Sequence, residues 1–477
     1  MNGSIELSRR NFILGSAAVG GVAAVEPAFA AERPLVLPTP EQVAWSEQEL
    51  GMFFHVDLPV FAHGKGVNVE HCKDLLDPNL YAPAKLDTDQ WMEAAKAMGA
   101  KYVVFVALHG TGFMQWQSDL YPYGLKQSKW RGGKGDVVKD FIASAHRYGL
   151  KPGFYAYARG GQYLAKRFPV KRPDGSVDLT MQKALSKMIE GYLEELWRDN
   201  GELFELWFDG GVLPVREGGP DVLRLVDKYQ PKAILFQGPG SRNLLRWVGN
   251  ERAVAPYPCW STGGRVTQSD GVKESRFPGH PDGSKWMPGE CDVPLRNHRW
   301  FWTPESEPHP GWRYWTDDEL VSKYYTSVGR NCNLLLNANI NADGLVPEED
   351  FGYYRRFGAN IRARFANPLA TTAGEGDLVE LKLPATGPVN QIAIGERIAD
   401  GQRIRAYEVE GVLADGTVKR LCGGTSVGHK RIQMFEPVAV KALRLRIRES
   451  AAKPLVKAFT AWNVKGQIAA AIDGSSS

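Results

Sequence analysis

Cysteine, net charge and long apolar runs are all scarce in this chain of 477 residues. The formal net charge of +4 is too small to indicate binding to nucleic acid or to an anionic membrane. The five cysteines are scattered and form no C-x-x-C pair, so neither a zinc site nor a disulfide framework is indicated. They are Cys72, Cys259, Cys291, Cys332 and Cys422.

No segment after the first thirty residues reaches 18 apolar residues, so we expect no membrane span in the mature chain.

The first thirty residues resemble an export signal. The segment SRRNFIL from Ser8 is a twin-arginine pattern, and the apolar run that continues to Val25 is too short to cross a bilayer. Cleavage after Ala30 would leave a periplasmic or secreted protein, with residues 1–30 removed as a twin-arginine signal peptide. An uncleaved N-terminal anchor is the alternative.

Aromatic residues, in contrast, are abundant, with 14 Trp, 17 Tyr and 20 Phe. Such a content is compatible with a large hydrophobic core. It also suits a carbohydrate site, where flat aromatic faces pack against the C–H surfaces of sugars. Composition alone therefore names no function.

Strand-like apolar runs alternate with helical patterns from Gly51 to about Ala366. The expected strands are Met52–Val56, Tyr102–Leu108, Gly153–Tyr157, Leu206–Asp209, Ile234–Gln237 and Asn333–Asn337. The expected helices are Asp87–Met98, Asp136–His146, Gln182–Trp197, Asp221–Tyr229, Asp317–Val328 and Glu348–Phe365. Buried strands separated by helices predict parallel βα units, and their number over this length favours a (β/α)8 barrel in residues 31–369. An open doubly wound sheet is the alternative, although no G-x-G-x-x-G follows the first strand.

The pattern changes after Leu369 to short alternating segments joined by turns. These segments are Leu378–Leu383, Gln391–Gly395, Ala406–Leu413, Thr417–Arg420 and Ala442–Ile447. They predict an antiparallel β-sandwich in residues 370–464. The Ala-, Gly- and Ser-rich residues 465–477 are expected to form a flexible tail.

Polar side chains stand at the ends of several predicted strands, where a barrel of this type carries its active site. Asp209 ends one strand before two glycines that permit close approach of a ligand, which suits a nucleophile. His55 and His109 end the first and second strands. An Asp before two glycines is also a common turn, and a single His is often a core residue. Two histidines at successive strand ends nevertheless indicate a polar pocket.

Several segments, in this order, together resemble glycoside hydrolase family 29, the α-L-fucosidases, and in particular the branch acting on α-1,3/1,4-linked fucose. They are GMFFHVD from Gly51, DQWMEAAKAMGAKYVVFVALHGTGF from Asp89, ELWFDGG from Glu205, RWVGNE from Arg246, CWST from Cys259, WMPGECDVPLR from Trp286, VGRNCNLLLNANINADGLVPEEDF from Val328, and GHKRIQMF from Gly428. The resemblance covers nearly the whole mature chain and implies a barrel followed by a sandwich.

The resemblance implies a role for each matching residue. Asp209 matches the catalytic nucleophile, and Glu251 resembles the acid/base of this branch. Glu290 is the second candidate for the acid/base; otherwise it is a structural or subsite carboxylate paired with Arg296. Four residues resemble the substrate-binding side chains of the fucose pocket: His55, His109, Tyr155 and Trp207.

The chain also departs from the family pattern at two strand ends. Val56-Asp57 replaces the Trp-Gly of F-H-W-G, and Leu108-His109-Gly110-Thr111-Gly112-Phe113 replaces K-H-H-D-G-F. The second histidine, which in the family reaches the axial O4 of fucose, is therefore missing at Gly110. Loss of one hydrogen bond to a buried hydroxyl costs about 1–3 kcal/mol, which is enough to change the preferred sugar.

The mechanism that the resemblance implies is two-step retention without a metal or organic cofactor. Asp209 would attack the anomeric carbon while Glu251 protonates the leaving oxygen, with the carboxyl groups roughly 5–5.5 Å apart. The substrate would be a fucosylated oligosaccharide or glycoconjugate. A hydrolase for a related sugar such as L-galactose or L-glucose, and a non-catalytic carbohydrate-binding relative, are the alternatives. The natural linkage and the oligomeric state stay open.

Overall fold

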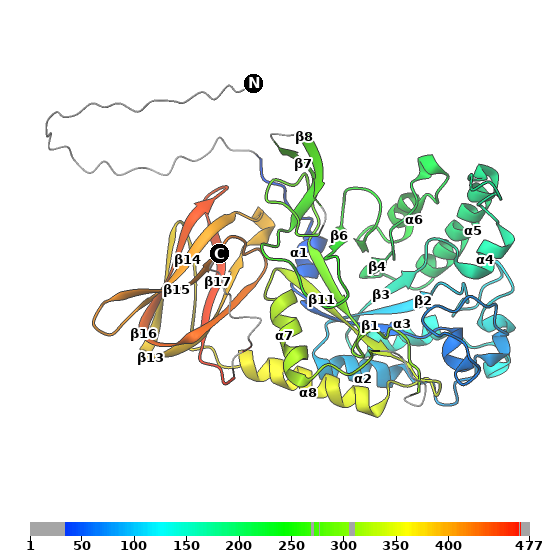
Figure 1. Cartoon of the computed structure of the whole chain (residues 1–477), viewed down its shortest axis with the longest axis horizontal. Helices are drawn as coiled ribbons and strands as arrows, with labels where there is room; N and C mark the ends of the chain where they lie inside the picture. The colour runs from blue at the N-terminus through cyan, green and yellow to red at the C-terminus, as the bar shows by residue number, and fades with distance from the viewer. Residues whose placement is uncertain (1–33, 269–270, 276, 305–310, 467, 469–477) are drawn as a thin grey trace, which may run out of the picture.

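The computed structural model describes residues 34–268, 271–275, 277–304, 311–466 and 468 (Figure 1). The expected signal peptide, residues 1–30, lies outside this part, as does most of the expected tail at 465–477. Eight parallel strands close into a barrel in the order β1-β11-β10-β6-β5-β4-β3-β2. This closure confirms the predicted barrel and rules out an open sheet.

The barrel strands are β1 (Leu50–His55), β2 (Tyr102–Leu108), β3 (Lys151–Ala156), β4 (Glu205–Trp207), β5 (Ile234–Phe236), β6 (Leu244–Trp247), β10 (Gly289–Val293) and β11 (Cys332–Asn339). The sequence predicts six of these strands but not β6 or β10. The helices are α1 (Pro40–Ser46), α2 (Thr88–Met98), α3 (Val137–Arg147), α4 (Gly161–Arg167), α5 (Leu179–Arg198), α6 (Val222–Tyr229), α7 (Asp317–Ser327) and α8 (Glu348–Phe365).

Local sequence signals set the ends of the helices, as α2 illustrates. The Asp87 side chain accepts hydrogen bonds from the backbone N–H groups of Asp89 and Gln90, which have no partner within the helix. The helix ends at Gly99, whose φ of 98° is a left-handed conformation that a residue with a side chain rarely adopts. Its buried side chains, including Trp91 and Met92, pack in the layer between the helices and the barrel.

A separate cluster of side chains fills the inside of the barrel. Successive residues of a strand point to opposite faces, so every second residue points inward. The interior cluster comprises Trp45, Phe53, Tyr102, Val104, Val106, Tyr155, Trp207, Ile234, Phe236, Leu245 and Leu335. Trp207 and Phe236 stack with ring centroids 3.9 Å apart. The barrel is therefore a packed core whose inward-facing aromatic residues continue up to the carboxyl ends of the strands.

A small antiparallel sheet is inserted between β6 and β10. It consists of β7 (Thr262–Gln268), β8 (Gly271–Ser275) and β9 (Lys285–Trp286) in the order β8-β7-β9. The sequence gives no expectation for it, because its strands are polar and rich in glycine and lack the alternation on which strand prediction depends.

The C-terminal domain is an antiparallel β-structure that begins at Ala370. Its strands are β12 (Ala370–Glu375), β13 (Leu378–Glu396), β14 (Ile404–Val412), β15 (Val418–Gly424), β16 (Arg431–Ser450) and β17 (Leu455–Trp462), in the order β12-β17-β13-β16-β14-β15. Two expected segments, Leu378–Leu383 and Gln391–Gly395, are parts of the single long strand β13. The pairing of β13 with β16 shifts register between Lys382 and Gly387, and such irregularities let one strand bend around a shared core.

The GHKRIQMF segment attaches this domain to the barrel at the end opposite the strands' carboxyl termini. Glu49, directly before β1, forms an ion pair with Lys430 and lies 3.4 Å from the imidazole of His429. It also accepts a hydrogen bond of 2.8 Å from the Tyr324 hydroxyl of α7. The backbone N–H of His429 donates a hydrogen bond to the side-chain oxygen of Asn331, which directly precedes β11. These contacts support a bracing role for the C-terminal domain.

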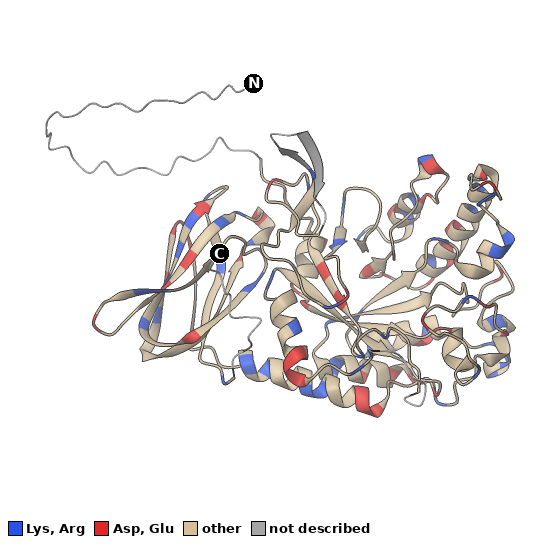
Figure 2. Cartoon of the chain, in the orientation of Figure 1, with Lys and Arg blue, Asp and Glu red and all other residues tan. Residues whose placement is uncertain are grey.

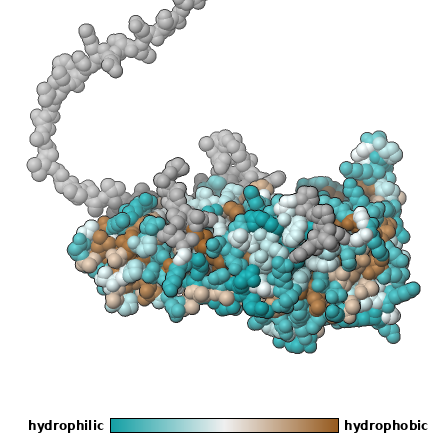
Figure 3. All heavy atoms as spheres, turned by 60° about the horizontal axis from the view of Figure 1, so that its bottom comes forward, coloured by the Kyte–Doolittle hydropathy of each residue, from teal (hydrophilic) through white to brown (hydrophobic). Residues whose placement is uncertain are grey.

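Charges of both signs are spread over the helices around the barrel and over the C-terminal sheet (Figure 2). On the face that Figure 3 presents, hydrophobic residues are scattered among hydrophilic ones. Within the described ranges, no helix combines the length and the apolar character that crossing a membrane requires. All five cysteines are buried free thiols.

Candidate active site

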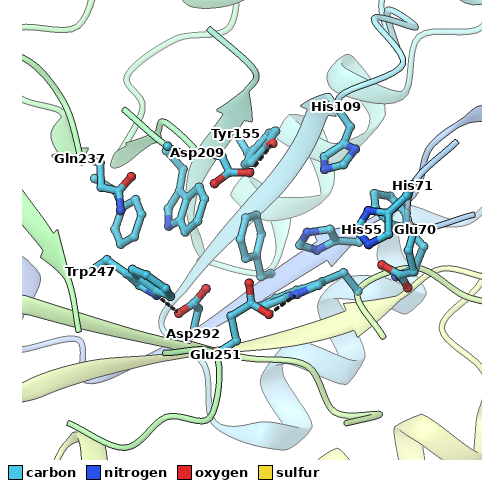
Figure 4. A pocket seen from close by; sticks show the side chains of 16 residues that line it. His55, Glu70, His71, His109, Tyr155, Asp209, Gln237, Trp247, Glu251 and Asp292 are labelled. Carbon is cyan, nitrogen blue, oxygen red and sulfur yellow. Dashed lines mark hydrogen bonds between the residues drawn. The ribbon is translucent and has the colours of Figure 1, made fainter. Parts of the chain in front are cut away.

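A cavity of about 350 Å³ opens at the carboxyl ends of the barrel strands (Figure 4). Its walls come from strand ends and from the loops that follow them. The lining residues are Phe53, His55, Glu70, His71, His109, Tyr155, Trp207, Asp209, Gly210, Phe236, Gln237, Trp247, Glu251, Asp292, Trp300 and Phe301. The structure thus brings together six of the seven site residues that the sequence predicts; Glu290 does not line this cavity.

Asp209 follows β4 by two residues and is exposed to the cavity. Gly210 and Gly211 after it have φ values of 65° and 76°, so the chain turns sharply where only glycine is unstrained. The Tyr155 hydroxyl donates a hydrogen bond of 3.3 Å to Oδ2 of Asp209. Partial burial raises the pKa of Asp209, whereas this hydrogen bond and the nearby Arg159 charge oppose the rise. The ionised form therefore has specific partners, as a nucleophile requires.

His55 and His109 present neutral imidazoles to the cavity. Burial, with a smaller contribution from the neighbouring His109, lowers the pKa of His55 to about 3. Burial likewise lowers the pKa of His109 to about 4. Nδ1 of His55 is buried and has no hydrogen-bond partner among the described residues. A neutral imidazole with a free ring nitrogen can donate to or accept from a sugar hydroxyl.

Tyr155 and Trp207 form an aromatic wall of the cavity. Their rings lie 5.5 Å apart at an interplanar angle of 24°. Burial and the charge of Asp209 raise the pKa of Tyr155 well above its usual range, so its hydroxyl stays a hydrogen-bond donor. This wall offers an apolar surface to the C–H face of a bound sugar.

Glu251 reaches the cavity from the loop after β6, four residues beyond the end of that strand. Its Oε2 accepts a hydrogen bond of 3.0 Å from the indole N–H of Trp300, and its side chain is otherwise exposed. Figure 4 shows the Asp209 and Glu251 carboxyl groups on opposite sides of the cavity, both pointing into it. A sugar ring bound between them would have one carboxyl group on either side.

Glu290 lies deeper, in the barrel interior, where it is 0% exposed. It accepts hydrogen bonds of 2.7 Å from the Tyr102 hydroxyl and 3.0 Å from the Trp207 indole. The expected pairing with Arg296 is wrong, because that arginine instead forms a buried ion pair of 2.8 Å with Asp350. Residues two apart in a strand point to the same side, so Glu290 and Asp292 of β10 both point into the barrel. Asp292 lies nearer the carboxyl end of the strand and lines the cavity, and Glu290 lies below it.

Glu290 has a second carboxyl group beside it, that of Glu205 in β4. Burial and the adjacent Glu290 charge raise the pKa of Glu205 well above its usual range, and burial raises the pKa of Glu290 to about 7. Two buried carboxyl groups in direct contact cannot both ionise, so they share a proton. The Trp45 indole donates to Oε2 of Glu205 and completes this polar layer below the cavity.

The sequence reasoning missed several residues of the cavity, most importantly Asp292 and Glu70. Burial raises the pKa of Asp292 well above its usual range, and the charge of Glu251 adds to the rise. The Trp247 indole donates a hydrogen bond of 2.7 Å to Asp292. Burial raises the pKa of Glu70 to about 7. Because alternate residues of a strand share a face, a prediction that Glu290 points inward could have indicated Asp292 as well. Glu70 lies on a long loop whose sequence has no periodic pattern.

The two departures from the family pattern meet in space. Thr111 donates a hydrogen bond of 2.8 Å to Oδ2 of Asp57, and the backbone N–H of Leu58 donates to Oδ1 of the same residue at 2.7 Å. Burial raises the pKa of Asp57 to about 7. A Cβ atom added to Gly110 would meet nothing within 4 Å, so the missing side chain leaves open space. Among the described residues, no group of three or more His, Cys, Asp or Glu side chains is arranged to hold a metal ion.

Known proteins share both this architecture and this sequence. The family model described as Alpha-L-fucosidase matches residues 73–363. Alpha-L-fucosidase 1 of Arabidopsis thaliana is 28% identical over 467 residues, which cover 88% of this chain and 86% of that protein. A crystal structure of a candidate α-L-fucosidase from Bacteroides thetaiotaomicron is 38% identical with a TM-score of 0.81, covering 90% of this chain and 100% of its own.

A crystal structure of a glycoside hydrolase 29 family member from an unknown rumen bacterium is 26% identical with a TM-score of 0.75. The match covers 92% of this chain and 80% of that one. The family match extends over more than half of the chain and includes the strand end that carries Asp209. The chain therefore belongs to the α-L-fucosidases of glycoside hydrolase family 29 and is a glycoside hydrolase.

Proposed function

We propose that this protein is an exported, retaining α-L-fucosidase with Asp209 as nucleophile and Glu251 as acid/base. The observation that carries the proposal is the position of these two carboxyl groups on opposite sides of one cavity (Figure 4). Neutral His55 and His109 and the aromatic wall complete a site suited to an uncharged deoxy sugar.

In the first step, Asp209 attacks the anomeric carbon as the bond to the leaving oxygen breaks and Glu251 gives that oxygen a proton. In the second step, Glu251 takes a proton from water, whose oxygen displaces Asp209 from the anomeric carbon. Tyr155 and Arg159 favour the ionised nucleophile between turnovers. Glu251 lies on the exposed side of the cavity, where a leaving group can reach it and depart.

We assign the acid/base role to Glu251 rather than Glu290, and with it the α-1,3/1,4 linkage preference of the branch that the sequence resembles. Glu290 accepts hydrogen bonds from Tyr102 and Trp207 and does not line the cavity. A general acid must reach the leaving oxygen within hydrogen-bond distance. Glu251 lines the cavity that a leaving group would enter, whereas Glu290 does not, and this difference supports the assignment.

A panel of 4-nitrophenyl glycosides tests the activity and the sugar preference. We expect release of nitrophenol from the α-L-fucoside at a kcat/KM at least about tenfold above that for the α-L-galactoside. L-Galactose carries one hydroxyl more than L-fucose, and that hydroxyl would have to fit at the apolar side of the site. NMR during the first minutes should show α-L-fucose before mutarotation. Turnover of β-L- or D-sugars alone, or β-L-fucose as first product, would overturn the proposal.

Export is tested by replacing Arg9 and Arg10 with lysine. The double variant keeps the charge but removes the twin-arginine pattern, so we expect the precursor to accumulate in the cytoplasm of a Gram-negative host. Fractionation followed by immunoblotting measures this. The control is Arg33→Lys, the same chemical change beyond the expected cleavage site. Mature double variant in the periplasm at the level of the control would contradict the export route.

A further inference from the structure

A second hollow, of about 450 Å³, adjoins the catalytic cavity. The two share the lining residues Glu70, His71, His109 and Asp209. The remaining walls come from the loops after β1, β2 and β3 and from α4, including Asp57, Gly110 and Tyr157. In Figure 4 three of the four shared residues, Glu70, His71 and His109, lie on the side away from Trp247 and Gln237, and Asp209 lies between the two sides.

Gly110 lines the second hollow directly after the shared residue His109 and leaves space there open. Its backbone is not in the left-handed region, and a Cβ atom there would meet nothing within 4 Å. A side chain at this position would therefore fit without backbone strain and would occupy the hollow. The loop itself is fixed, because Gly110 and Thr111 accept backbone hydrogen bonds of 2.7 and 3.1 Å from Gln162 and Tyr163 of α4.

The direction of the hollow follows from the two carboxyl groups of the site. Asp209 lines both spaces, but Glu251 lines only the catalytic cavity. The leaving group must lie next to the acid, on the side of Glu251. The second hollow therefore faces the sugar that is transferred to Asp209, and not the leaving group.

The hollow has the chemistry of a site for an uncharged polyol. Burial raises the pKa values of Asp57 and Glu70 to about 7 and lowers that of His109 to about 4. Near neutral pH Asp57 and Glu70 are each only partly ionised and His109 is neutral, so these groups can both donate and accept hydrogen bonds, and Tyr157 adds an aromatic face. The two basic residues of the hollow, Lys73 and Arg159, are exposed at its rim. An anionic ligand inside the hollow would approach the carboxyl groups of Asp57 and Glu70, which disfavours it.

We propose that the hollow beyond Gly110 binds a second neutral monosaccharide attached to the fucosyl ring, so that the enzyme releases substituted fucose as an intact disaccharide. This rests on the proposed function. The bond between the anomeric carbon and the leaving oxygen breaks; water supplies the hydroxyl to that carbon and the proton to the leaving oxygen. The glycosidic bond within the released disaccharide stays intact.

The test compares 2-chloro-4-nitrophenyl α-L-fucoside with the same aryl glycoside of α-L-fucobiose, linked 1→2, 1→3 or 1→4. Chromatography below about 5% conversion identifies the first sugar released. We expect intact fucobiose from at least one linkage, with a kcat/KM within about tenfold of the monofucoside. Free fucose as the first product from all three would overturn the inference. No release from the monofucoside would instead refute the proposed function. If a sulfate ester of the monofucoside is cleaved faster than every fucobioside, the hollow binds an anionic group and the proposal of a neutral ligand is wrong.

Two pairs of variants connect this activity to the hollow. Gly110→His should lower the ratio of fucobioside to monofucoside kcat/KM at least tenfold, while Gly110→Ala should change it less than threefold. Ala165→Trp, from the α4 wall, should also lower the ratio, whereas Lys166→Trp, which does not line the hollow, serves as its control. Monofucoside turnover verifies that each variant is folded. If the ratio of fucobioside to monofucoside kcat/KM is unchanged in both Gly110→His and Ala165→Trp, the second monosaccharide does not bind in this hollow. If Gly110→His is inactive on the monofucoside, the result for Ala165→Trp alone decides.

Discussion

Replacing Asp209 with asparagine should lower kcat for aryl α-L-fucosides by at least about 10³-fold while leaving the fold intact. The amide has nearly the same shape as the carboxylate but is a much weaker nucleophile, so the glycosyl-enzyme cannot form at a useful rate. Tyr155 can still donate to the amide oxygen, and Gly210 and Gly211 keep the turn. Initial rates with a chromogenic fucoside, together with the melting temperature, measure both parts of the expectation.

The matched control is Asp227→Asn, the same change at an exposed aspartate of α6 that pairs with Arg242 on the surface. It should retain full activity, because exposed ion pairs contribute little to stability and neither residue of this pair lines the catalytic cavity. If purified Asp209→Asn keeps more than about a tenth of wild-type activity, another group is the nucleophile.

Replacing Glu251 with alanine should produce a loss that depends on the leaving group. Natural sugar leaving groups need a proton, so their hydrolysis should slow by about 10²–10⁴-fold. An aryl glycoside with an acidic phenol needs little protonation and should lose far less in its first step. The second step also loses its base, and azide, which needs no deprotonation, should restore part of it and yield a glycosyl azide of retained configuration.

Two other carboxyl groups provide the comparison. Glu290→Gln preserves the volume of the buried side chain, and we expect it to weaken activity on all substrates alike, through the Trp207 that Glu290 holds, without azide rescue. Asp292→Asn keeps an acceptor for Trp247 and should behave in the same way. Azide rescue at either position, and none at Glu251, would transfer the acid/base role to that residue.

The strands that the sequence predicts are those with continuous apolar runs. YVVFVAL in β2 is buried on both faces and therefore reads as a strand without further information. β6 and β10 escape prediction because each places polar groups among its few residues: Arg246 in one, and Glu290 and Asp292 in the other. Their polar side chains are satisfied only by residues far away in the sequence, such as the backbone carbonyls that accept from Arg246.

The same distinction applies to the site. Asp209, His55 and His109 could be predicted because each stands at or near the end of a recognisable strand, and the closed barrel brings all strand ends together. Glu70 and Trp300 could not, since they lie on long loops whose paths depend on the tertiary structure. The depth of Glu290 also needed the structure: its place in the motif suggests the site, but the unpredicted strand β10 fixes which face it takes.

The pairing of β1 with β11 bears on the order in which the chain can assemble during synthesis. Leu50 pairs with Leu334, about 280 residues later. Every residue that lines the catalytic cavity, from Phe53 to Phe301, is made before β11. Until Cys332–Asn339 leaves the ribosome, β1 and β10 keep open hydrogen-bonding edges that can pair with other chains. A nascent chain that has not reached β11 thus contains all the residues of the cavity but has no closed barrel to hold them together.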